Sequence, residues 1–274
     1  MHSPELRVAI LGVSGRMGGA LLKALDEIPG AKLQGATASP GSRWIGKDAS
    51  APHTGAQRDV KISGSAAEAL RGAGVAIDFT LPNATEANLD AAIRSGCAVV
   101  LGTTGHDEAQ RQRILDASRR IPIVWAANTS LGVNLLLKLV EIAAATLGDA
   151  YDLEIFEAHH RNKKDAPSGT ALALGRAAAH GRKVALDEVA EFDRHGHSQA
   201  RGKGAIGFSV FRGGDVVGDH TVTFAGIGER IELTHKASDR MAFARGAMQA
   251  AQWLFGKPAG LYSMSDVLGL NVRS

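Results

Sequence analysis

The sequence has little cysteine, few aromatic residues and almost no excess of one charge. Its 274 residues include a single cysteine, Cys97, which excludes an intrachain disulfide framework and fits a reducing cytosol. Phe, Trp and Tyr make up 5% of the chain, which argues against a sandwich of short aromatic-rich strands. Lys and Arg number 31 against 28 Asp and Glu, and this surplus is too small to indicate a nucleic-acid-binding surface.

Long hydrophobic runs are also lacking. No apolar run approaches the roughly 20 residues that a membrane-spanning helix needs. The N-terminus has one short apolar stretch, which carries Glu5 and Arg7, whereas a signal peptide needs a longer apolar core and a cleavage site of small residues. We therefore expect a cytoplasmic protein that binds neither membrane nor nucleic acid.

Glycine, in contrast, is abundant at 33 residues, and hydrophobic residues make up 45% of the chain. Up to about residue 130, short apolar runs alternate with helical patterns, which predicts βαβ units and a parallel sheet of the Rossmann-like α/β class. Strands are expected at 6–11, 31–37, 75–79, 98–102 and 121–125, with helical segments at about 20–25 and 84–95. The segment 39–55 has no period, and its order is not predicted.

The pattern changes after about residue 128. A long apolar helix is expected at 132–147, and a second helix is expected from Ser168 to about His180. Strands are expected at 151–158, 205–211, 220–224 and 230–234, before a last helix at 241–254. This region predicts an α+β domain with a mixed, largely antiparallel sheet.

Three glycines follow the first expected strand at a regular spacing: Gly12, Gly15 and Gly18. They lie between a strand and a helix, as a dinucleotide-binding fingerprint requires, although glycine triplets also occur in ordinary turns. The helix N-terminus would stabilise the charge of a pyrophosphate. Segments 102–105 and 126–129 follow later strands, and the carboxyl ends of parallel strands line one crevice.

The densest chemistry lies just after the strand expected at 151–158. Histidine, arginine and lysine side chains crowd into 159–164, and the helix capped by Ser168 then presents backbone N–H groups at Gly169 and Thr170. A charge run of this kind is usually a solvated loop. Backbone N–H groups beside histidine and lysine, however, also form a site for a carboxylate-bearing substrate and supply proton donors near neutral pH.

These segments resemble the 4-hydroxy-tetrahydrodipicolinate reductases, also called dihydrodipicolinate reductases, of the bacterial diaminopimelate and lysine pathway. The resemblance covers essentially the whole chain. Its most specific part is the signature E-A-H-H-x-x-K-x-D-A-P-S-G-T-A at 157–171. The other matching segments are 12–18, 78–80, 102–105, 126–128, 226–230 and 234–238.

The resemblance implies a dinucleotide-binding Rossmann domain over 1–130, a substrate-binding and tetramerisation domain over 131–240, and a C-terminal segment, 241–274, that returns to the first domain. It also implies a homotetramer that passes hydride from NADPH or NADH to a cyclic imine dicarboxylate, giving tetrahydrodipicolinate and water. His159 and Lys163 would then be the acid–base pair. The substrate carboxylates would be held by His160, Gly169 and Thr170. The cofactor would be contacted by Gly12, Val13, Ser14, Gly15, Arg16, Met17, Ser39, Gly102, Thr103, Thr104, Ala126, Ala127, Asn128 and Thr129.

The chain departs from the family pattern in two places. Ala38 and Ser39 stand where members often carry an acidic residue followed by arginine, and Thr129 stands where they often carry phenylalanine. A carboxylate at the first position would accept hydrogen bonds from the ribose 2′-OH and repel a 2′-phosphate. With Ala38 there, and with Arg16 and Arg43 nearby in the sequence, we expect NADPH to be accepted at least as well as NADH.

Other interpretations are weaker. Another two-domain NAD(P)-dependent dehydrogenase acting on a small carboxylate would share the glycine loop. A nucleotide-sensing regulator with a vestigial site could lack Lys163 or His159, and both are present. His195 and His197 suggest a metal site, but no ligand spacing typical of metal centres supports one, and no metal is expected.

Overall fold

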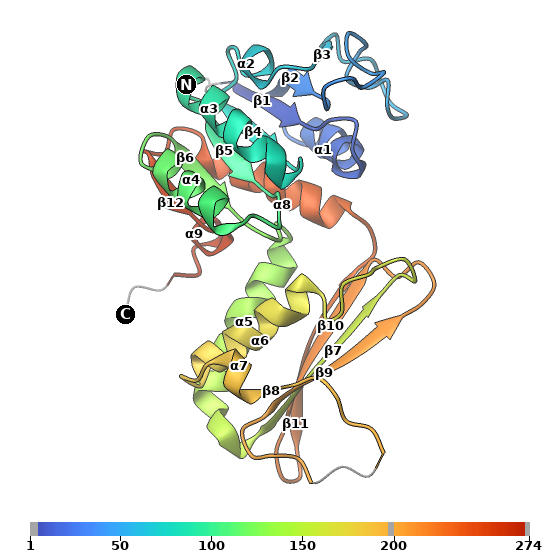
Figure 1. The fold of residues 1–274 in the computed structure, drawn as a ribbon, viewed down its shortest axis with the longest axis vertical. Helices are drawn as coiled ribbons and strands as arrows, with labels where there is room; N and C mark the ends of the chain where they lie inside the picture. Colours follow the sequence, from blue (N-terminus) through green and yellow to red (C-terminus); the bar gives the residue numbers. More distant parts are fainter. Residues whose placement is uncertain (1–4, 197–199, 272–274) are drawn as a thin grey trace. The chain divides into compact units, whose positions relative to one another are not determined.

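The computed structural model describes residues 5–196 and 200–271. They divide into two compact units, whose elements are labelled in Figure 1. The first unit contains the chain up to Leu131 together with the chain from Arg240 onward, and the second is Gly132–Asp239.

The first unit contains a seven-stranded sheet in the order β12-β6-β5-β4-β1-β2-β3. Each of its strand pairings is parallel, as expected from the alternation of strands and helices. The strands are β1 (Leu6–Leu11), β2 (Ala31–Thr37), β3 (Ile62–Ser63), β4 (Val75–Asp78), β5 (Ala98–Leu101), β6 (Pro122–Trp125) and β12 (Gly260–Tyr262).

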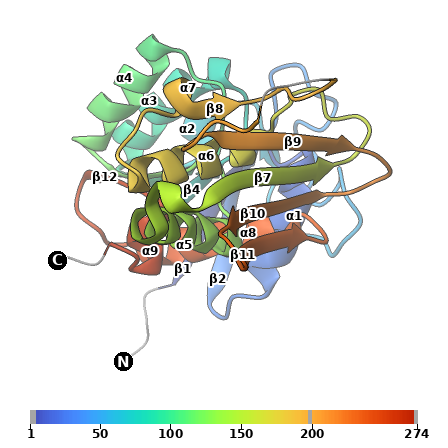
Figure 2. The ribbon, with the colours of Figure 1, turned by 90° about the horizontal axis from the view of Figure 1, so that it is seen from below.

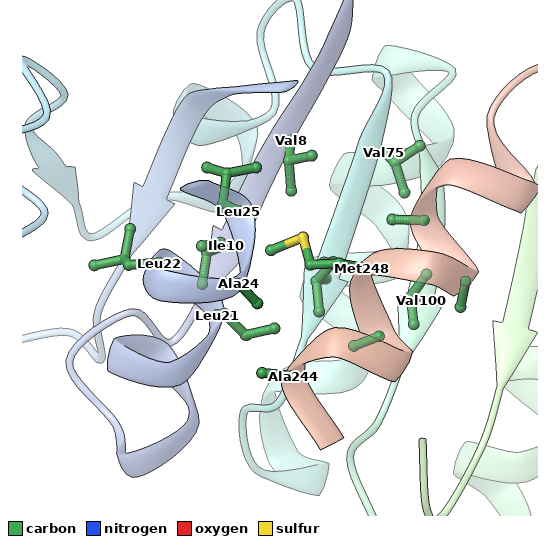
Figure 3. Close-up of a cluster of buried hydrophobic side chains, with 14 of the residues drawn as sticks. Val8, Ile10, Leu21, Leu22, Ala24, Leu25, Val75, Val100, Ala244 and Met248 are labelled. Carbon is green, nitrogen blue, oxygen red and sulfur yellow. The ribbon is translucent and has the colours of Figure 1, made fainter. Parts of the chain in front are cut away.

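Helices cover both faces of this sheet. One face packs against α1 (Arg16–Asp26), α8 (Met241–Leu254) and α9 (Met264–Leu268), and the other against α2 (Ala66–Ala69), α3 (Thr85–Ser95) and α4 (Glu108–Ser118), while η1 (Pro82–Ala84) leads into α3. Val8 and Ile10 of β1 point toward α1 and α8 (Figure 3), whereas Ala9 and Leu11 belong to the opposite cluster. Burial on both sides explains why β1 is an almost continuous apolar run.

The C-terminal segment completes the first unit. Strand β12 pairs with β6, and Arg245 of α8 forms an ion pair with Glu27 at 2.7 Å. The sequence did not predict α4, β3 or β12. Helix α4 buries only Ile114, Ala117 and Ser118, and strands of two or three residues are too short to show a period.

The second unit contains a five-stranded mixed sheet in the order β11-β10-β7-β9-β8. Its strands are β7 (Asp152–His159), β8 (Ala190–Glu191), β9 (Ile206–Arg212), β10 (Gly218–Ala225) and β11 (Arg230–Ala237). Strand β10 runs antiparallel to β11 and β7, while β9 runs parallel to β7 and β8. Strands β9 and β10 are consecutive in the chain but lie on opposite sides of β7 (Figure 2).

Helices α5 (Leu131–Leu147) and α6 (Gly169–Gly181) pack on one face of this sheet, and η2 (Gly148–Ala150) and α7 (Leu186–Val189) follow them. The expectation that no apolar run is long enough for a membrane span is wrong. By length and composition alone, the helical segment Leu131–Ala150 is long and apolar enough to cross a membrane. Leu136, Val140 and Ala144 of this helix pack into the core of the unit, whereas Leu135, Leu139 and Ile142 are exposed. A single helix of this length and composition is weak evidence for a membrane.

Candidate functional site

The glycine loop of the first unit has the shape of a phosphate-binding turn. Gly12 has a φ of +78°, and a Cβ on it would lie 3.0 Å from Thr80 Cγ2. A Cβ on Gly18 would lie 1.8 Å from the carbonyl oxygen of Val13, so only glycine lets α1 begin this close to β1. Gly15 is the N-cap of α1 and provides no side-chain cap, which leaves the first turn of the helix to other acceptors.

The remaining cofactor-site candidates of this unit include buried and exposed groups. Thr103 Oγ1 is buried and lies 3.3 Å from both Asp78 Oδ1 and the Thr80 carbonyl oxygen. Gly102 is a necessary glycine, because a Cβ there would lie 2.4 Å from the Phe79 ring. Among the same candidates, Ser14 and Met17 are half-buried, Val13 and Ala126 are buried, and Arg16, Thr104 and Ala127 are exposed.

Thr129 does not present its hydroxyl group to a ligand. Its side chain is buried, and Oγ1 donates to the Phe243 carbonyl oxygen of α8 at 2.7 Å. A contact of Thr129 with a cofactor would therefore come from its backbone. The Asn128 side chain accepts from Ser130 N at 2.9 Å and shapes the same turn.

The segment after β2 is built from successive turns. Ala38 is buried and donates its N–H to Ser63 O at 3.1 Å, while the exposed Ser39 accepts from Ser42 N at 3.0 Å. The Arg43 guanidinium lies 4.7 Å, and the Lys47 ammonium 5.0 Å, from the centroid of the Trp44 ring. The segment therefore holds two cations against one aromatic ring.

In the second unit, the predicted acid His159 is the last residue of β7. Its ring is almost fully buried, and Nδ1 lies 2.5 Å from Glu157 Oε2. Glu157 lies two positions earlier in the strand, so both side chains point to the same face of the sheet. The other ring nitrogen, Nε2, lies beside Gly218, where a Cβ would approach it to 3.0 Å.

A chain of contacts links His159 to Lys163. Arg212, the last residue of β9, binds both oxygens of Glu157 at 2.8 Å and also donates to the Asp165 carbonyl oxygen at 2.6 Å. The Asp165 carboxylate lies 2.8 Å from Lys163 Nζ. His160 is half-buried, and its carbonyl oxygen accepts from Lys163 N at 3.1 Å, which closes a turn.

Helix α6 begins beside Glu157. Ser168 caps the helix by accepting from Ala171 N at 3.1 Å, and its own N–H donates to Glu157 Oε1 at 2.9 Å. Gly169 is exposed, and a Cβ there would meet nothing within 4 Å, so the start of the helix faces open space at this residue. Thr170, in the same first turn, is half-buried.

A second buried histidine lies behind the first. His220 of β10 has its Nε2 3.1 Å from Ser168 Oγ, and its ring meets the His159 ring edge to face with centroids 5.1 Å apart. Among the described residues, no group hydrogen-bonds to its buried Nδ1.

Burial and charge act in opposite directions on this cluster. Burial lowers the pKa of His159, the Glu157 carboxylate acts to raise it, and Lys163 and Arg212 lower it further. Burial acts to raise the pKa of Glu157, but hydrogen bonds from Arg212 and His159 outweigh it and leave that pKa below its usual value. Burial is also the main cause that lowers the pKa of His220 to about 4.

The structure thus brings His159, Lys163 and the start of α6 into one network, through groups that the sequence analysis did not assign. Glu157 could have been found from its position two residues before His159 on a strand, whereas Arg212 could not, because it lies 55 residues from Glu157 in the chain. His195 is exposed beside Asp193, and His197 lies outside the described residues. Within 5–196 and 200–271, no group of three potential metal ligands is found.

Comparisons with known proteins give the same family over nearly the whole length of the chain. A family model described as "Dihydrodipicolinate reductase, N-terminus" matches residues 6–129, and one described as "Dihydrodipicolinate reductase, C-terminus" matches residues 132–268. A 4-hydroxy-tetrahydrodipicolinate reductase from Thiobacillus denitrificans is 54% identical over 266 residues, which cover 97% of this chain and 99% of that protein. One from Pseudomonas fluorescens is 50% identical over the same shares of both chains.

Solved structures share the fold. A dipicolinate-bound dihydrodipicolinate reductase from Paenisporosarcina sp. TG-14 has a TM-score of 0.75 at 23% identity, covering 94% of this chain and 97% of its own. An amine dehydrogenase from Mycobacterium smegmatis has a TM-score of 0.58 at 12% identity, so the fold alone does not identify a substrate. The two family models and the close relatives do identify the family: this chain belongs to the dihydrodipicolinate reductases.

Proposed function

We propose that the chain catalyses the reaction for which its relatives are named, the NAD(P)H-dependent reduction of 4-hydroxy-tetrahydrodipicolinate to tetrahydrodipicolinate in lysine and diaminopimelate biosynthesis. The observation that carries the proposal is the network joining His159, Lys163 and the start of α6. It combines a proton donor, a cation and a helix N-terminus, which a dianionic substrate that must be protonated requires.

The residues of the first unit fit a dinucleotide. The turn at Gly12 and Gly18 leaves room that any side chain would fill, and the first turn of α1 has no side-chain cap. The glycine loop and residues 102–104 and 126–129 would hold the cofactor, with Thr129 contributing its backbone. When bound, the nicotinamide supplies the hydride.

The segment after β7 would bind the substrate. Lys163 would act with His159 as the acid–base pair. His160 would balance carboxylate charge, and the backbone N–H groups of Gly169 and Thr170 would bind one carboxylate. The helix that presents these groups is anchored at Ser168 by Glu157, so the anion site is fixed before the substrate arrives.

His159 would deliver the proton. Loss of water from 4-hydroxy-tetrahydrodipicolinate leaves a carbon–carbon double bond conjugated with the imine. Hydride addition to the far carbon of that bond leaves electron density on the adjacent carbon, and a proton donor must stand beside it. The ring of His159 is held at Nδ1 by Glu157, so Nε2 is the nitrogen that can exchange a proton with substrate. Burial keeps its pKa below the ordinary value, and a bound dianion would raise it.

A coupled assay tests the proposal. The substrate is unstable, so it is made freshly by the condensing enzyme that precedes this step, and oxidation of NADPH and NADH is followed separately. We expect oxidation that depends on the substrate and is lost in His159→Gln. A chain that bound the cofactor but oxidised it only with other carbonyl compounds would instead be a different dehydrogenase. One that bound it without any turnover would be a nucleotide-sensing regulator.

We also infer that NADPH is accepted at least as well as NADH. A buried alanine, Ala38, stands where a carboxylate would repel a 2′-phosphate, and the following segment holds Arg43 and Lys47 against Trp44. A charge-assisted contact to phosphate contributes about 1.5–3 kcal/mol, roughly a 10- to 100-fold preference.

Measurement of kcat/KM for both cofactors checks this preference. Arg16→Ala and Arg43→Ala should each lower the value for NADPH more than that for NADH. Arg113→Ala is the control, because Arg113 pairs with Asp90 on the opposite side of the sheet and should change neither. A parent enzyme that strongly prefers NADH would contradict the inference.

The assembly and location that we propose are a homotetramer in the cytoplasm, with residues 1–130 and 241–274 binding the cofactor and 131–240 binding substrate and other subunits. The support for the tetramer is the second face of the five-stranded sheet. Within the described part of that unit no helix covers this face, and it exposes Phe156, Phe211 and a Thr221–Thr234 hydroxyl pair 3.0 Å apart. Exposed aromatic residues on one sheet face are typical of subunit interfaces.

A further inference from the structure

Glu157 is the most completely bonded carboxylate among the described residues of the second unit, and in the proposed reaction it acts through its neighbours rather than on the substrate itself. Its side chain is 1% exposed. Oε1 accepts from Ser168 N and Arg212 Nη2, and Oε2 accepts from His159 Nδ1 and Arg212 Nη1. Both oxygens therefore have two donors, and these donors come from three separate parts of the site.

The contact with His159 determines which ring nitrogen carries the proton. An ionised carboxylate only accepts hydrogen bonds, so the Nδ1 atom 2.5 Å away must be protonated. Nε2 is then the nitrogen that gains or loses a proton. It lies beside Gly218, which has no side chain to block it.

Arg212 balances the charge of Glu157. Its guanidinium binds both carboxylate oxygens at 2.8 Å, so the histidine ring faces a paired carboxylate rather than an isolated one. The charged groups that act on His159 are Glu157 on its own strand, Lys163 in the next loop and Arg212 on β9. The neighbouring ring of His220 on β10 has its own pKa lowered, chiefly by burial. Glu157 favours the imidazolium of His159, and Lys163 and Arg212 oppose it.

We infer that Glu157 is a positioning residue that fixes the Nδ1-protonated tautomer of His159 and anchors the first turn of α6, with Arg212 setting the strength of its effect. The inference rests on the proposed function only where it assigns Nε2 to the substrate proton. The tautomer and the balance of charge are properties of the protein without substrate.

Two substitutions should shift His159 in opposite directions. Glu157→Gln leaves a single acceptor oxygen. Because Ser168 N can only donate, we expect this oxygen to accept from Ser168 N, and the amide N–H₂ group then faces His159. The neutral ring should then change to the Nε2-protonated tautomer, and its pKa should fall because Arg212 is left unbalanced. Arg212→Gln removes the opposing charge, so the pKa should rise with the tautomer unchanged. Combining both should return the pKa toward that of the parent while the tautomer stays altered.

The readout is ¹⁵N-histidine NMR of the full chain without substrate, with the His159 signal assigned by its loss in His159→Gln. In parallel, kcat/KM is measured, and Glu157→Gln should lower it by about 10²-fold or more. Glu154→Gln is the matched control. Glu154 lies on the same strand and is bound by Arg194 at 2.6 Å and Arg201 at 3.0 Å, so its loss should leave the His159 signal and the rate unchanged.

The outcomes separate the two claims. A parent tautomer with Nε2 protonated, or a Glu157→Gln protein in which the tautomer and pKa of His159 are those of the parent, would overturn the inference. The same holds if Arg212→Gln lowers the pKa or leaves it unchanged, a test that remains if Glu157→Gln does not fold. If the two variants shift the pKa of His159 in opposite directions but the parent protein does not reduce the substrate, the positioning role is supported and the proposed function is refuted.

Discussion

His159 is held between burial, which disfavours its charged form, and the Glu157 carboxylate, which favours it. If it is the proton donor, kcat/KM should fall as pH rises through its pKa in the free enzyme, which lies below the ordinary value for histidine. The limb for kcat should lie at higher pH, because a bound dianion stabilises the imidazolium. His159→Gln should remove both limbs and lower kcat/KM by about 10²- to 10⁴-fold, and pH profiles of parent and variant check this.

Substitutions of Lys163 and Thr170 should affect different steps: Lys163 the chemical step, and Thr170 the binding of substrate. Lys163→Ala should lower turnover strongly while the fold remains intact, because the side chain lies on a loop and its ion pair is with the exposed Asp165 carboxylate. Thr170→Val should mainly raise the KM for the substrate and leave that for the cofactor nearly unchanged. Equal changes in the two KM values would place Thr170 outside the substrate pocket.

His220 makes stability depend on pH. Its pKa of about 4 in the folded protein lies below the unfolded value near 6.5, so the unfolded chain binds the extra proton as pH falls. This contribution to stability is fully present above about pH 6.5 and is lost progressively toward pH 4. The free energy of unfolding should drop by roughly 3 kcal/mol over that window. Urea denaturation of parent and His220→Gln tests this, and parallel slopes in the two proteins would contradict it.

In the second unit, the site residues predicted from the sequence lie within one contiguous motif. His159, Lys163 and the start of α6 lie within a dozen residues, and their chemistry can be read from residue type and a helix cap. Arg212 and His220 could not be predicted in this way, because they reach Glu157 and Ser168 only through the pairing of β9 and β10 with β7. The burial of the Thr129 hydroxyl against α8 likewise depends on a helix more than a hundred residues away.

At the scale of elements, the turn from β1 into α1 depends on one close approach. Gly18→Ala would place a Cβ 1.8 Å from the Val13 carbonyl oxygen, where backbone rather than a flexible side chain must give way. Overpacking of this kind costs about 1–3 kcal/mol, and it should also weaken cofactor binding. Gly55→Ala is the control, because a Cβ there would meet nothing within 4 Å. Thermal unfolding and cofactor titration of both variants check the difference.

Elements with a clear apolar pattern were predicted well, and those whose position comes from pairing were not. Strand β1, helix α8 and the apolar helix α5 follow from their own residues. Strand β12 forms by pairing with the edge strand β6, so its own three residues do not predict it. Helix α4 is largely polar, and it begins at a capping box formed by Asp107 and Gln110.

At the scale of the whole molecule, the proposed homotetramer would form through the face of the five-stranded sheet that no helix of the described second unit covers. Phe156→Arg places a charge at the centre of this face, opposite Thr221, and should convert the proposed tetramer to smaller species. Leu81→Arg changes an equally apolar but 68% exposed side chain in the first unit and should leave the tetramer intact. Light scattering after size-exclusion chromatography measures both, and a Phe156→Arg protein that remains tetrameric would contradict the proposed interface.

The central claim is direct hydride transfer to a cyclic imine dicarboxylate. It is tested most directly by supplying freshly made 4-hydroxy-tetrahydrodipicolinate with NADPH deuterated at its transferable position and analysing the product by mass spectrometry. We predict tetrahydrodipicolinate that carries one deuterium for each cofactor oxidised, formed about 10²- to 10⁴-fold more slowly with His159→Gln. Cofactor oxidation without deuterium in tetrahydrodipicolinate, or no oxidation at all, would contradict the account.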